Sequence, residues 1–283
     1  MTETIRNQRA ANLPAHLSRS WLLVNAASPE TFRPAQASEA DSVIFDMEAA
    51  VPQSKKDAAR DNVVDALNNG MSGWVRINSI TTEEWQTDLE ALSGLPGLRG
   101  IVLPNTEKPE QVTLTAMGAG AGVPVLALIE TAIGVENATH IAEAPGTFRL
   151  ALGTNDLRKN TGIEDDPLAL AYVRSRLVIS SRVGGLPGAI DGPTPRGTST
   201  EDVREACRWT MKMGMTGTLV LDLDALGTIN TALAPSEDDR AWARELLAAE
   251  DDDSAYVDGS YLPRLKRARK IAQLADSYGL WKQ

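Results

Sequence analysis

Short apolar runs alternate with segments of helical periodicity along most of the chain. The apolar runs predict buried strands near residues 20–25, 42–48, 73–78, 100–105, 123–130, 148–156, 188–191 and 218–222. Between them, apolar residues recur at helical spacing, as at Ala59, Val63 and Leu67. Parallel strands that are buried on both faces need helical crossovers. The pattern therefore predicts a (β/α)8 TIM barrel with an extra C-terminal helical segment, and a doubly wound open sheet is the alternative.

The two ends of the chain lie outside this alternation. Residues 1–18 form a polar lead-in, residues 19–249 form the expected barrel domain, and residues 250–283 form a C-terminal extension. The extension begins with the acidic break at 250–253 and continues as a basic helix over 261–278. This helix carries an apolar stripe at Leu262, Leu265, Ala268, Ile271, Ala272 and Ala275. The stripe is expected to pack either on its own barrel or on a neighbouring subunit.

Composition narrows the class of protein. The 283 residues are 42% hydrophobic and 23% charged, which suits one large globular enzyme domain. A formal charge of -10 argues against a nucleic-acid partner or an anionic membrane surface, and no apolar run approaches the roughly 18 residues of a membrane span. The single cysteine, Cys207, can form no internal disulfide, and two histidines make a zinc site improbable. We expect a cytoplasmic protein.

The predicted strands end in polar residues. In barrels of this type the active site lies at the carboxyl ends of the strands. The residues found there are Asn25, Asp46, Glu48, Arg76, Asn78, Asn105, Glu130, Asp156, Asp191, Asp222 and Asp224. Any one of them is more often a turn residue or a helix cap than a catalytic group. Their convergence on one barrel mouth is what favours an active site.

Two carboxylates stand out as candidate metal ligands. Glu130 and Asp156 follow two consecutive apolar runs that are joined by a helical segment. Carboxylates without accompanying histidines favour Mg2+, with Mn2+ as an alternative, over zinc, and Mg2+ needs only one or two protein carboxylates. Arg76 is expected to bind a substrate carboxylate or a developing oxyanion. The other interpretation of Arg76 is a structural ion pair with Glu48 or Glu130.

A set of short motifs carries a resemblance to a known family. The motifs are R-S-W-L-L-V at Arg19, D-M-E-A-A-V at Asp46, K-K-D-A-A-R at Lys55, V-R-I-N at Val75, L-P-N at Leu103, L-I-E-T-A-I-G at Leu128, G-T-N-D-L at Gly153, A-I-D-G-P at Ala189 and Y-V-D-G at Tyr256. In this order and spacing the chain resembles the citrate lyase beta-subunit-like branch of the HpcH/HpaI aldolase family, from Arg19 to about Ala272.

The resemblance implies a site and an assembly. It implies an Mg2+ ion held by Glu130 and Asp156, substrate binding by Arg76, and a catalytic acid at Glu48 that acts through a metal-bound water. It further implies a homotrimer or hexamer in which the C-terminal segment reaches a neighbour. The implied reaction cleaves or forms a carbon–carbon bond between a small 2-keto acid and an enolate, often that of an acyl-CoA.

The same reaction needs further groups. The backbone amides of Thr131 and Ala132, at the start of a predicted helix, are candidates to receive a substrate carboxylate. Asp191 is a further candidate substrate ligand. The general base stays open among Glu48, Asp191 and Asp222.

The sequence departs from the family pattern at several positions. Ala49 replaces the second acid of D-x-E-D, Asn105 replaces the lysine of L-P-K, and Asn25 replaces a common proline. D-L-D-A at Asp222 replaces H-P-x-Q, and Pro263 replaces the aspartate that serves as a catalytic group in the acyl-CoA lyases. Loss of a general acid or base typically costs about 10²–10⁴-fold in rate.

The metal half of the site therefore looks retained and the CoA half altered. We predict an Mg2+-dependent carbon–carbon lyase that acts on a small carboxylic acid, with the use of acyl-CoA left open. The alternative is a catalytically weakened paralogue that binds a metabolite or a partner subunit. A third possibility, a solvated acidic rim without a ligand, is disfavoured because clustered carboxylates repel one another unless a cation is present.

Overall fold

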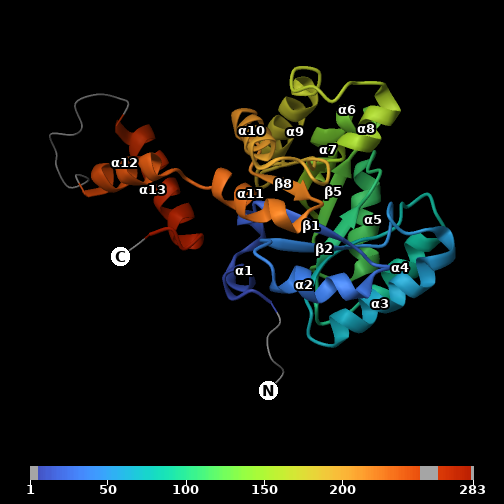
Figure 1. Cartoon of the computed structure of the whole chain (residues 1–283). Coiled ribbons are helices and arrows are strands. Elements are labelled where there is room, and N and C mark those ends of the chain that lie inside the picture. Colours follow the sequence, from blue (N-terminus) through green and yellow to red (C-terminus); the bar gives the residue numbers. More distant parts are fainter. Residues whose placement is uncertain (1–5, 249–260, 282–283) are drawn as a thin grey trace.

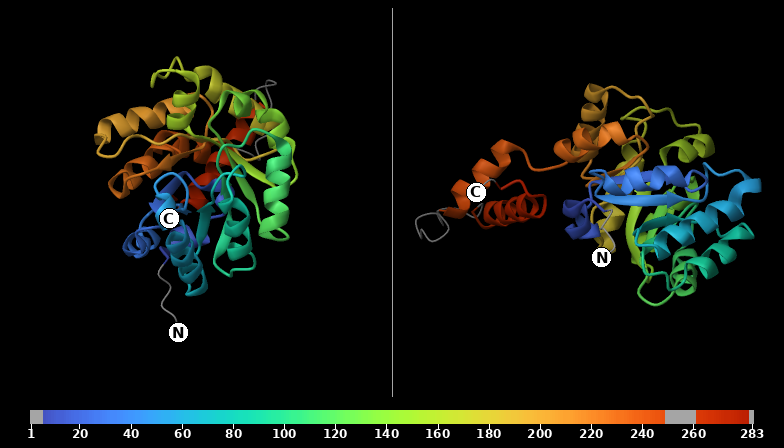
Figure 2. Two further views of the ribbon diagram at one scale, coloured as in Figure 1. Left: turned by 90° about the vertical axis from the view of Figure 1, so that its right-hand side faces the viewer. Right: turned by 60° about the horizontal axis from the view of Figure 1, so that its bottom comes forward.

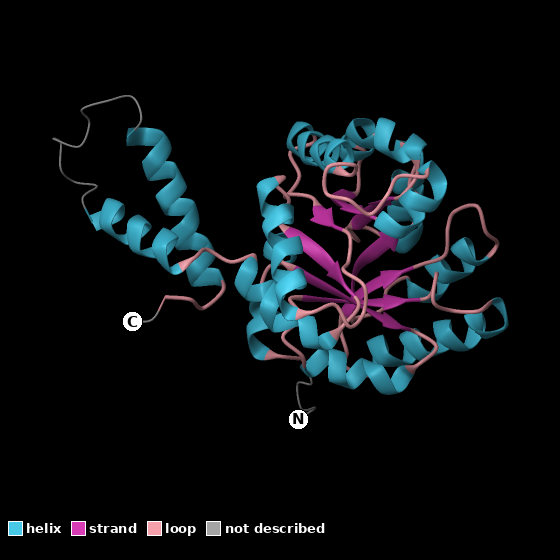
Figure 3. Cartoon of the chain, turned by 45° about the horizontal axis from the view of Figure 1, so that its top comes forward, coloured by secondary structure: helices cyan, strands magenta, loops and turns pink. Residues whose placement is uncertain are grey.

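A computed structural model describes residues 6–248 and 261–281. Eight parallel strands close into a barrel in chain order, as the sequence predicts (Figure 3). The strands are β1 (Ser20–Asn25), β2 (Ser42–Asp46), β3 (Gly73–Arg76), β4 (Leu98–Leu103), β5 (Val125–Ile129), β6 (Thr147–Leu152), β7 (Ile190–Asp191) and β8 (Gly217–Val220). The open sheet is thereby excluded, because β1 pairs with both β2 and β8.

Helices surround the barrel and extend beyond it (Figure 1). They are α1 (Gln8–Asn12), α2 (Phe32–Ala37), α3 (Lys56–Asn68), α4 (Glu84–Leu92), α5 (Pro109–Ala119), α6 (Ala132–Glu136), α7 (Ala138–Glu143), α8 (Thr154–Thr161), α9 (Ala171–Val183), α10 (Thr200–Lys212), α11 (Leu226–Ala232), α12 (Glu237–Ala248) and α13 (Tyr261–Ser277). In the described part of the chain, every helix is too short or too polar to cross a bilayer.

Two differences from the predicted elements affect the site. The apolar run that we expected to reach Asp156 ends as a strand at Leu152, and Asp156 lies in the first turn of α8. The helix expected over residues 135–144 is two short helices that meet at Asn137, whose side chain donates to Glu107 O at 2.8 Å. This hydrogen bond fixes Asn137 at the break between the two helices. Helical periodicity in the sequence does not reveal the break.

The direction of each side chain follows from the alternation along the strands. One buried cluster fills the barrel interior with Trp21, Leu23, Ile44, Trp74, Val102, Leu126, Leu128, Ala151, Ile190 and Leu219. A second, larger cluster lies between the strands and the helices. Because successive residues of a strand point to opposite faces, a residue two positions after an interior one also points inward. Asp46, Arg76 and Glu130 hold such positions, after Ile44, Trp74 and Leu128.

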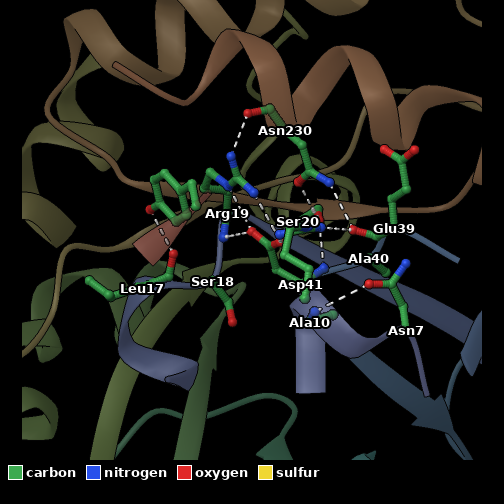
Figure 4. Close-up of polar contacts among 12 residues, drawn as sticks. Asn7, Ala10, Leu17, Ser18, Arg19, Ser20, Glu39, Ala40, Asp41 and Asn230 are labelled. Atoms are coloured by element: carbon green, nitrogen blue, oxygen red, sulfur yellow. Dashed lines mark hydrogen bonds and ion pairs between the residues drawn. The ribbon is translucent and has the colours of Figure 1, made fainter. Parts of the chain in front are cut away.

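The amino ends of the strands are closed by a buried ion pair (Figure 4). Arg19 donates from Nε and from its backbone N–H to Asp41 Oδ2, at 2.8 and 2.9 Å, and from Nη1 to Asn230 O at 2.7 Å. Burial alone would raise the pKa of Asp41, but the hydrogen bonds and charge of Arg19 outweigh it and hold that pKa below its usual value. The pair ties the start of β1 to the entry of β2 and to α11.

The C-terminal helices α12 and α13 pair with each other and stand out from one side of the barrel (Figures 1 and 2). Their shared core contains Ala243, Ala268 and Ile271. The apolar stripe of α13 is therefore covered mainly by α12, although Leu262 is 61% exposed. At its end, Tyr278 donates to Leu17 O at 2.8 Å.

The helical unit begins at Glu237, whereas we expected the extension to begin at residue 250; the division of the chain into domains stays a prediction. The acidic break at 250–253 and the motif at 256–259 lie outside the described residues.

We predict that Asp41→Ala lowers the free energy of unfolding by about 3–5 kcal/mol, because it leaves the buried Arg19 charge without its carboxylate. Urea denaturation followed by circular dichroism measures the change. Glu201→Ala is the matched control, since it removes an exposed partner of Arg204 and should cost less than about 1 kcal/mol. Equal stabilities of the two variants would contradict the role given to Asp41.

Candidate active site

A cavity of about 290 Å³ lies at the carboxyl ends of the strands. It is lined by Leu23, Asn25, Asp46, Ala49, Ala50, Arg76, Leu128, Glu130, Gly153, Thr154, Asn155, Asp156, Pro193, Arg196, Leu219 and Leu221. Four leucines, two alanines and a proline supply its apolar surface. The charged residues come from β2, β3, the end of β5, α8 and the loop after β7. Three of the predicted site residues, Arg76, Glu130 and Asp156, therefore share one cavity.

The Arg76 guanidinium is held by a carboxylate on the neighbouring strand. Its Nε and Nη2 donate to the two oxygens of Asp46 at 2.7 and 2.6 Å, and its Nη1 lies 3.4 Å from Glu48 Oε2. Burial would lower the pKa of Arg76, but the charge of Asp46 and its hydrogen bonds raise it above the usual value. A structural ion pair is thus present, with Asp46 as its main partner. Of the three guanidinium nitrogens, Nη1 is the one that is not bound to Asp46.

Glu48 follows β2 in a loop that Lys56 fixes. The Lys56 ammonium donates to Met47 O and Glu48 O, each at 2.8 Å, and the Glu48 N–H donates to Asp46 Oδ1 at 3.0 Å. Burial raises the pKa of Glu48; the charge of Arg76 opposes this rise, and those of Asp46 and Asp156 add to it. Glu48 is absent from the cavity lining, so it reaches the site through its contact with Arg76.

Glu130 is buried, and among the three acids that line the cavity it is the one without an ion pair in the described part of the chain. Its Oε1 accepts from the Asn105 N–H at 2.7 Å, and Asn105 has a left-handed φ of 49°, which asparagine tolerates better than most residues. Burial raises the pKa of Glu130 to about 7, with the charges of Asp156 and Glu48 adding to the rise and Asn105 and Arg76 opposing it. A Cβ at position 153 would lie 2.3 Å from Glu130 Oε2, so Gly153 makes room for this carboxylate.

Asp156 supplies a more accessible carboxylate. Its side chain is 44% exposed, and Lys159, one turn further along α8, donates to Oδ1 at 2.7 Å. The charge of Asp156 raises the pKa of both Glu48 and Glu130, which places the three acids within electrostatic reach of one another. Lys159 is 77% exposed, so its ion pair is screened by solvent and open to exchange for another cation.

The donor set fits magnesium. Among the described residues, no group of three or more His, Cys, Asp or Glu side chains is arranged to hold a metal. Two carboxylates, Glu130 and Asp156, with open space beside them match the preference of Mg2+ for few protein ligands and several exchangeable positions. The recess that Gly153 leaves for Glu130, and the raised pKa of that buried acid, are the features that a cation would complement.

The other predicted residues lie elsewhere. Asp191 follows the inward-facing Ile190 and points outward, where Arg174 Nε donates to both of its oxygens at 3.0 and 3.1 Å and Thr210 donates at 2.8 Å. Thr131 caps α6 by accepting from the Gly134 N–H. None of these residues lines the cavity, and the role of Asp191 as a substrate ligand stays a prediction.

The amide of Ala132 has an internal partner. Its N–H donates to Asn160 Oδ1 at 3.0 Å. Ala132 does not line the cavity either. Its amide would need a local rearrangement to receive a substrate carboxylate.

Two charged residues of the cavity were not among the predicted site residues. Asp46 appears in the sequence as one polar strand end among many, and its pairing with Arg76 depends on the β2–β3 register, which aligns the two. Arg196 lies in the G-P-T-P-R-G loop after β7, where no sequence signal separates it from an ordinary turn residue.

A closed (β/α)8 barrel with paired carboxylates at its mouth has the features of an enzyme that uses a divalent metal ion as a Lewis acid. Comparison with known proteins specifies the family. The HpcH/HpaI aldolase/citrate lyase model matches residues 19–222, and the HpcH/HpaI aldolase C-terminal domain model matches residues 238–279. The chain belongs to this family.

Individual relatives agree with the family assignment. A (3S)-malyl-CoA thioesterase of Cereibacter sphaeroides is 29% identical over 263 residues, which cover 89% of this chain and 91% of that protein. A citrate lyase subunit beta-like protein of Mycobacterium tuberculosis is 32% identical over 81% of this chain and 84% of its own length. The crystal structure of CitE from M. tuberculosis with magnesium, acetoacetate and coenzyme A is similar with a TM-score of 0.76 and 28% identity, covering 92% of this chain and 99% of that one.

We predict that Glu130→Gln and Asp156→Asn each abolish Mg2+ binding and leave the fold intact, because each removes one charged ligand without changing side-chain volume. Calorimetric titration with MgCl2 measures the affinity, and circular dichroism checks the fold. Asp202→Asn, on the exposed start of α10, is the matched control. Unchanged Mg2+ affinity in both site variants would sink the ligand assignment.

We also predict that Mg2+ affinity rises with pH through about 7, because the metal requires the ionised form of Glu130, whose pKa is raised to about 7. Between pH 4.5 and about 7, the folded, metal-free protein keeps a proton on Glu130 that the unfolded chain has released. The free energy of unfolding of the metal-free protein therefore decreases as the pH rises through this range. Titrations at pH 6 and pH 8, in buffers of different ionisation enthalpy, measure affinity and proton release. A pH-independent affinity without proton release would contradict the prediction.

Proposed function

We propose that this protein is an Mg2+-dependent carbon–carbon lyase of the citrate lyase beta-like type. It cleaves or forms a bond between a small 2-oxo acid and an enolate, either that of an acyl-CoA or that of a free acid. The observation that carries the proposal is the meeting of Glu130, Asp156 and Arg76 at one cavity on the barrel mouth.

The relatives support this class of reaction. They include a citramalyl-CoA lyase of Rattus norvegicus, besides the malyl-CoA thioesterase. Solved complexes of the M. tuberculosis protein contain magnesium with acetoacetate and coenzyme A, with oxaloacetate, and with pyruvate. These complexes have magnesium and a small oxo acid in common, and the cavity of this chain offers Glu130 and Asp156 to hold such a pair.

In the proposed site, Glu130 and Asp156 hold the metal ion. When bound, Mg2+ supplies Lewis-acid polarisation of a carbonyl and stabilises an adjacent oxyanion. Glu130 is fixed by the Asn105 N–H and by the recess at Gly153, so this ligand is preorganised. Asp156 exchanges its contact with Lys159 for the metal ion. The four leucines of the cavity limit water around the reacting carbons.

Arg76 and Glu48 are the proposed catalytic residues. Arg76 keeps its positive charge inside the barrel because Asp46 binds two of its three nitrogens, and its Nη1 edge is directed towards Glu48. A substrate carboxylate or an oxyanion would compete with Glu48 for the Nη1 edge of Arg76. Glu48 has a raised pKa, which suits a group that accepts and returns a proton.

Substrate and assembly are the finer parts of the proposal. The substrate is a small carboxylic acid, with acyl-CoA as the second reactant in one version; Asp191 and the amides of Thr131 and Ala132 remain candidate substrate contacts. The protein is proposed to act in the cytoplasm as a homotrimer or hexamer. The position of the α12–α13 pair, which stands out from its own barrel, supports such an assembly (Figure 2).

The second candidate function is a weakened paralogue that binds a metabolite or a partner subunit without turnover. Pro263, in the first turn of α13, favours it, because proline supplies no acid where the acyl-CoA lyases of this family have a catalytic aspartate. Turnover separates the two candidates, since both predict ligand binding.

We predict that oxaloacetate, pyruvate or glyoxylate binds the protein in the presence of Mg2+ and fails to bind in EDTA. Calorimetric titration measures this difference, with acetyl-CoA and propionyl-CoA titrated in parallel. Product analysis of mixtures of oxo acid and acyl-CoA then detects bond formation or cleavage. Metal-dependent binding without any product would favour a weakened paralogue that binds a metabolite. Absence of binding in both conditions would contradict the lyase and favour a paralogue that binds a partner subunit.

A further inference from the structure

The two cations that contact acids at the cavity mouth are already engaged. Arg76 is bound by both oxygens of Asp46, and Lys159 is bound by Asp156. The carboxylates of Asp46, Asp156, Glu130 and Glu48 exceed these two cations by two charges, which one divalent cation offsets. An acid that carries two carboxylates would therefore bring negative charge that only a further cation can compensate.

Arg196 is the remaining cation of the cavity. It lines the same cavity as Glu130 and Asp156, and it lies in the loop between β7 and α10. Within residues 6–248 and 261–281, its side chain makes no hydrogen bond or ion pair. An unpaired guanidinium can form a two-point contact with a carboxylate.

The loop holds Arg196 in a defined turn. Thr198 N–H donates to Pro195 O at 3.3 Å, and Gly197 has a φ of 72°, as the third residue of a type II turn requires. The Thr198 hydroxyl bonds the same carbonyl at 2.7 Å, and the Gly197 N–H donates to Asp222 Oδ2 at 3.3 Å. Asp222 follows β8, so this last bond fixes the turn to the barrel mouth.

Arg196 occupies the second position of the turn. Pro195, directly before it, has a fixed φ angle and so restricts the backbone of the loop. A side chain on a restricted turn loses less conformational entropy on binding than one on a free loop. The backbone of the loop is therefore ordered before a ligand arrives, while the guanidinium of Arg196 has no partner among the residues that the structure describes.

We infer that Arg196 binds the second carboxylate of a dicarboxylic 2-oxo acid, and thereby selects such acids over monocarboxylic ones. This inference rests on the proposed function, which places the 2-oxo-carboxylate end at Glu130 and Asp156. Arg196 acts as a specificity-determining residue at the other end of the substrate. A carboxylate fits better than a phosphate chain, because Arg196 is a single cation in a cavity whose other charged residues are mostly acids.

The test is calorimetric titration of the Mg2+-loaded full-length protein with oxaloacetate and with pyruvate, which differ by one carboxylate. Arg196→Gln should weaken the binding of oxaloacetate about 10- to 100-fold, the range expected for a hydrogen-bonded charge pair. The binding of pyruvate should change less than about twofold, and Mg2+ affinity should not change. Arg196→Lys should recover part of the loss, since it keeps the charge but not the fork.

Arg182→Gln is the matched control. It removes the same charge from the exposed last turn of α9, away from the cavity lining, and should leave both affinities unchanged. Equal losses for the two acids in Arg196→Gln, or no loss for oxaloacetate, would overturn the inference. A loss confined to acetyl-CoA would overturn it in favour of a phosphate contact.

The wild-type titrations separate this inference from the proposed function. Mg2+-dependent binding of pyruvate supports the proposed function whatever Arg196 does. If the wild type binds neither acid, both the proposed function and this inference fail.

Discussion

The arrangement of charge at the barrel mouth depends on the buried pair between Arg76 and Asp46. The buried Arg76 guanidinium needs acceptors that compensate its charge, because an uncompensated buried charge is far costlier than a compensated one. Asp46 meets this need from the adjacent strand and uses both of its oxygens to do so. Glu130 is therefore left with a single backbone hydrogen bond and a pKa raised to about 7. The pair thus keeps one strong cation in the site and leaves the remaining acids for a metal ion.

This pair in turn depends on closure of the barrel below it. The layer beneath the site is packed by Trp21 and Trp74, whose rings meet edge to face at 5.3 Å, and by the fully buried Arg149. Arg149 bonds Ser18 O, Gly188 O and Thr216 Oγ1 rather than a carboxylate, and burial lowers its pKa to about 9. These bonds join β6 to the starts of β1, β7 and β8. A fixed lower layer is what lets residues two positions further along the strands meet at the mouth.

The barrel could be predicted from the sequence, because strand length and helical spacing are local signals. The meeting of Glu130 and Asp156 at one cavity could also be predicted, although Asp156 lies in the first turn of α8 and not at a strand end, and their role as metal ligands stays a prediction. The outward direction of Asp191 could not be predicted. Its strand has two residues, and a parallel strand buried on both faces shows no polar–apolar alternation from which to read a direction. The pairing of Asp46 with Arg76 needs the register between β2 and β3, which is set by packing over the whole barrel. The position of Arg196 at the cavity depends on the path of its loop, and the only sequence signals for that path are the turn residues Pro195 and Gly197.

The charges of the mouth also imply an order of binding. Before a metal ion arrives, the charges of Asp156 and Glu48 raise the pKa of Glu130, and the charge of Asp156 raises that of Glu48. An anionic acid that approached these carboxylates would be repelled. A divalent cation held by Glu130 and Asp156 would offset this repulsion and favour the ionised form of Glu130, and its charge would attract the acid. Since Arg76 is already committed to Asp46, it cannot replace the cation in this first step. Metal before acid is therefore the sequence of events that the electrostatics of this cavity favours.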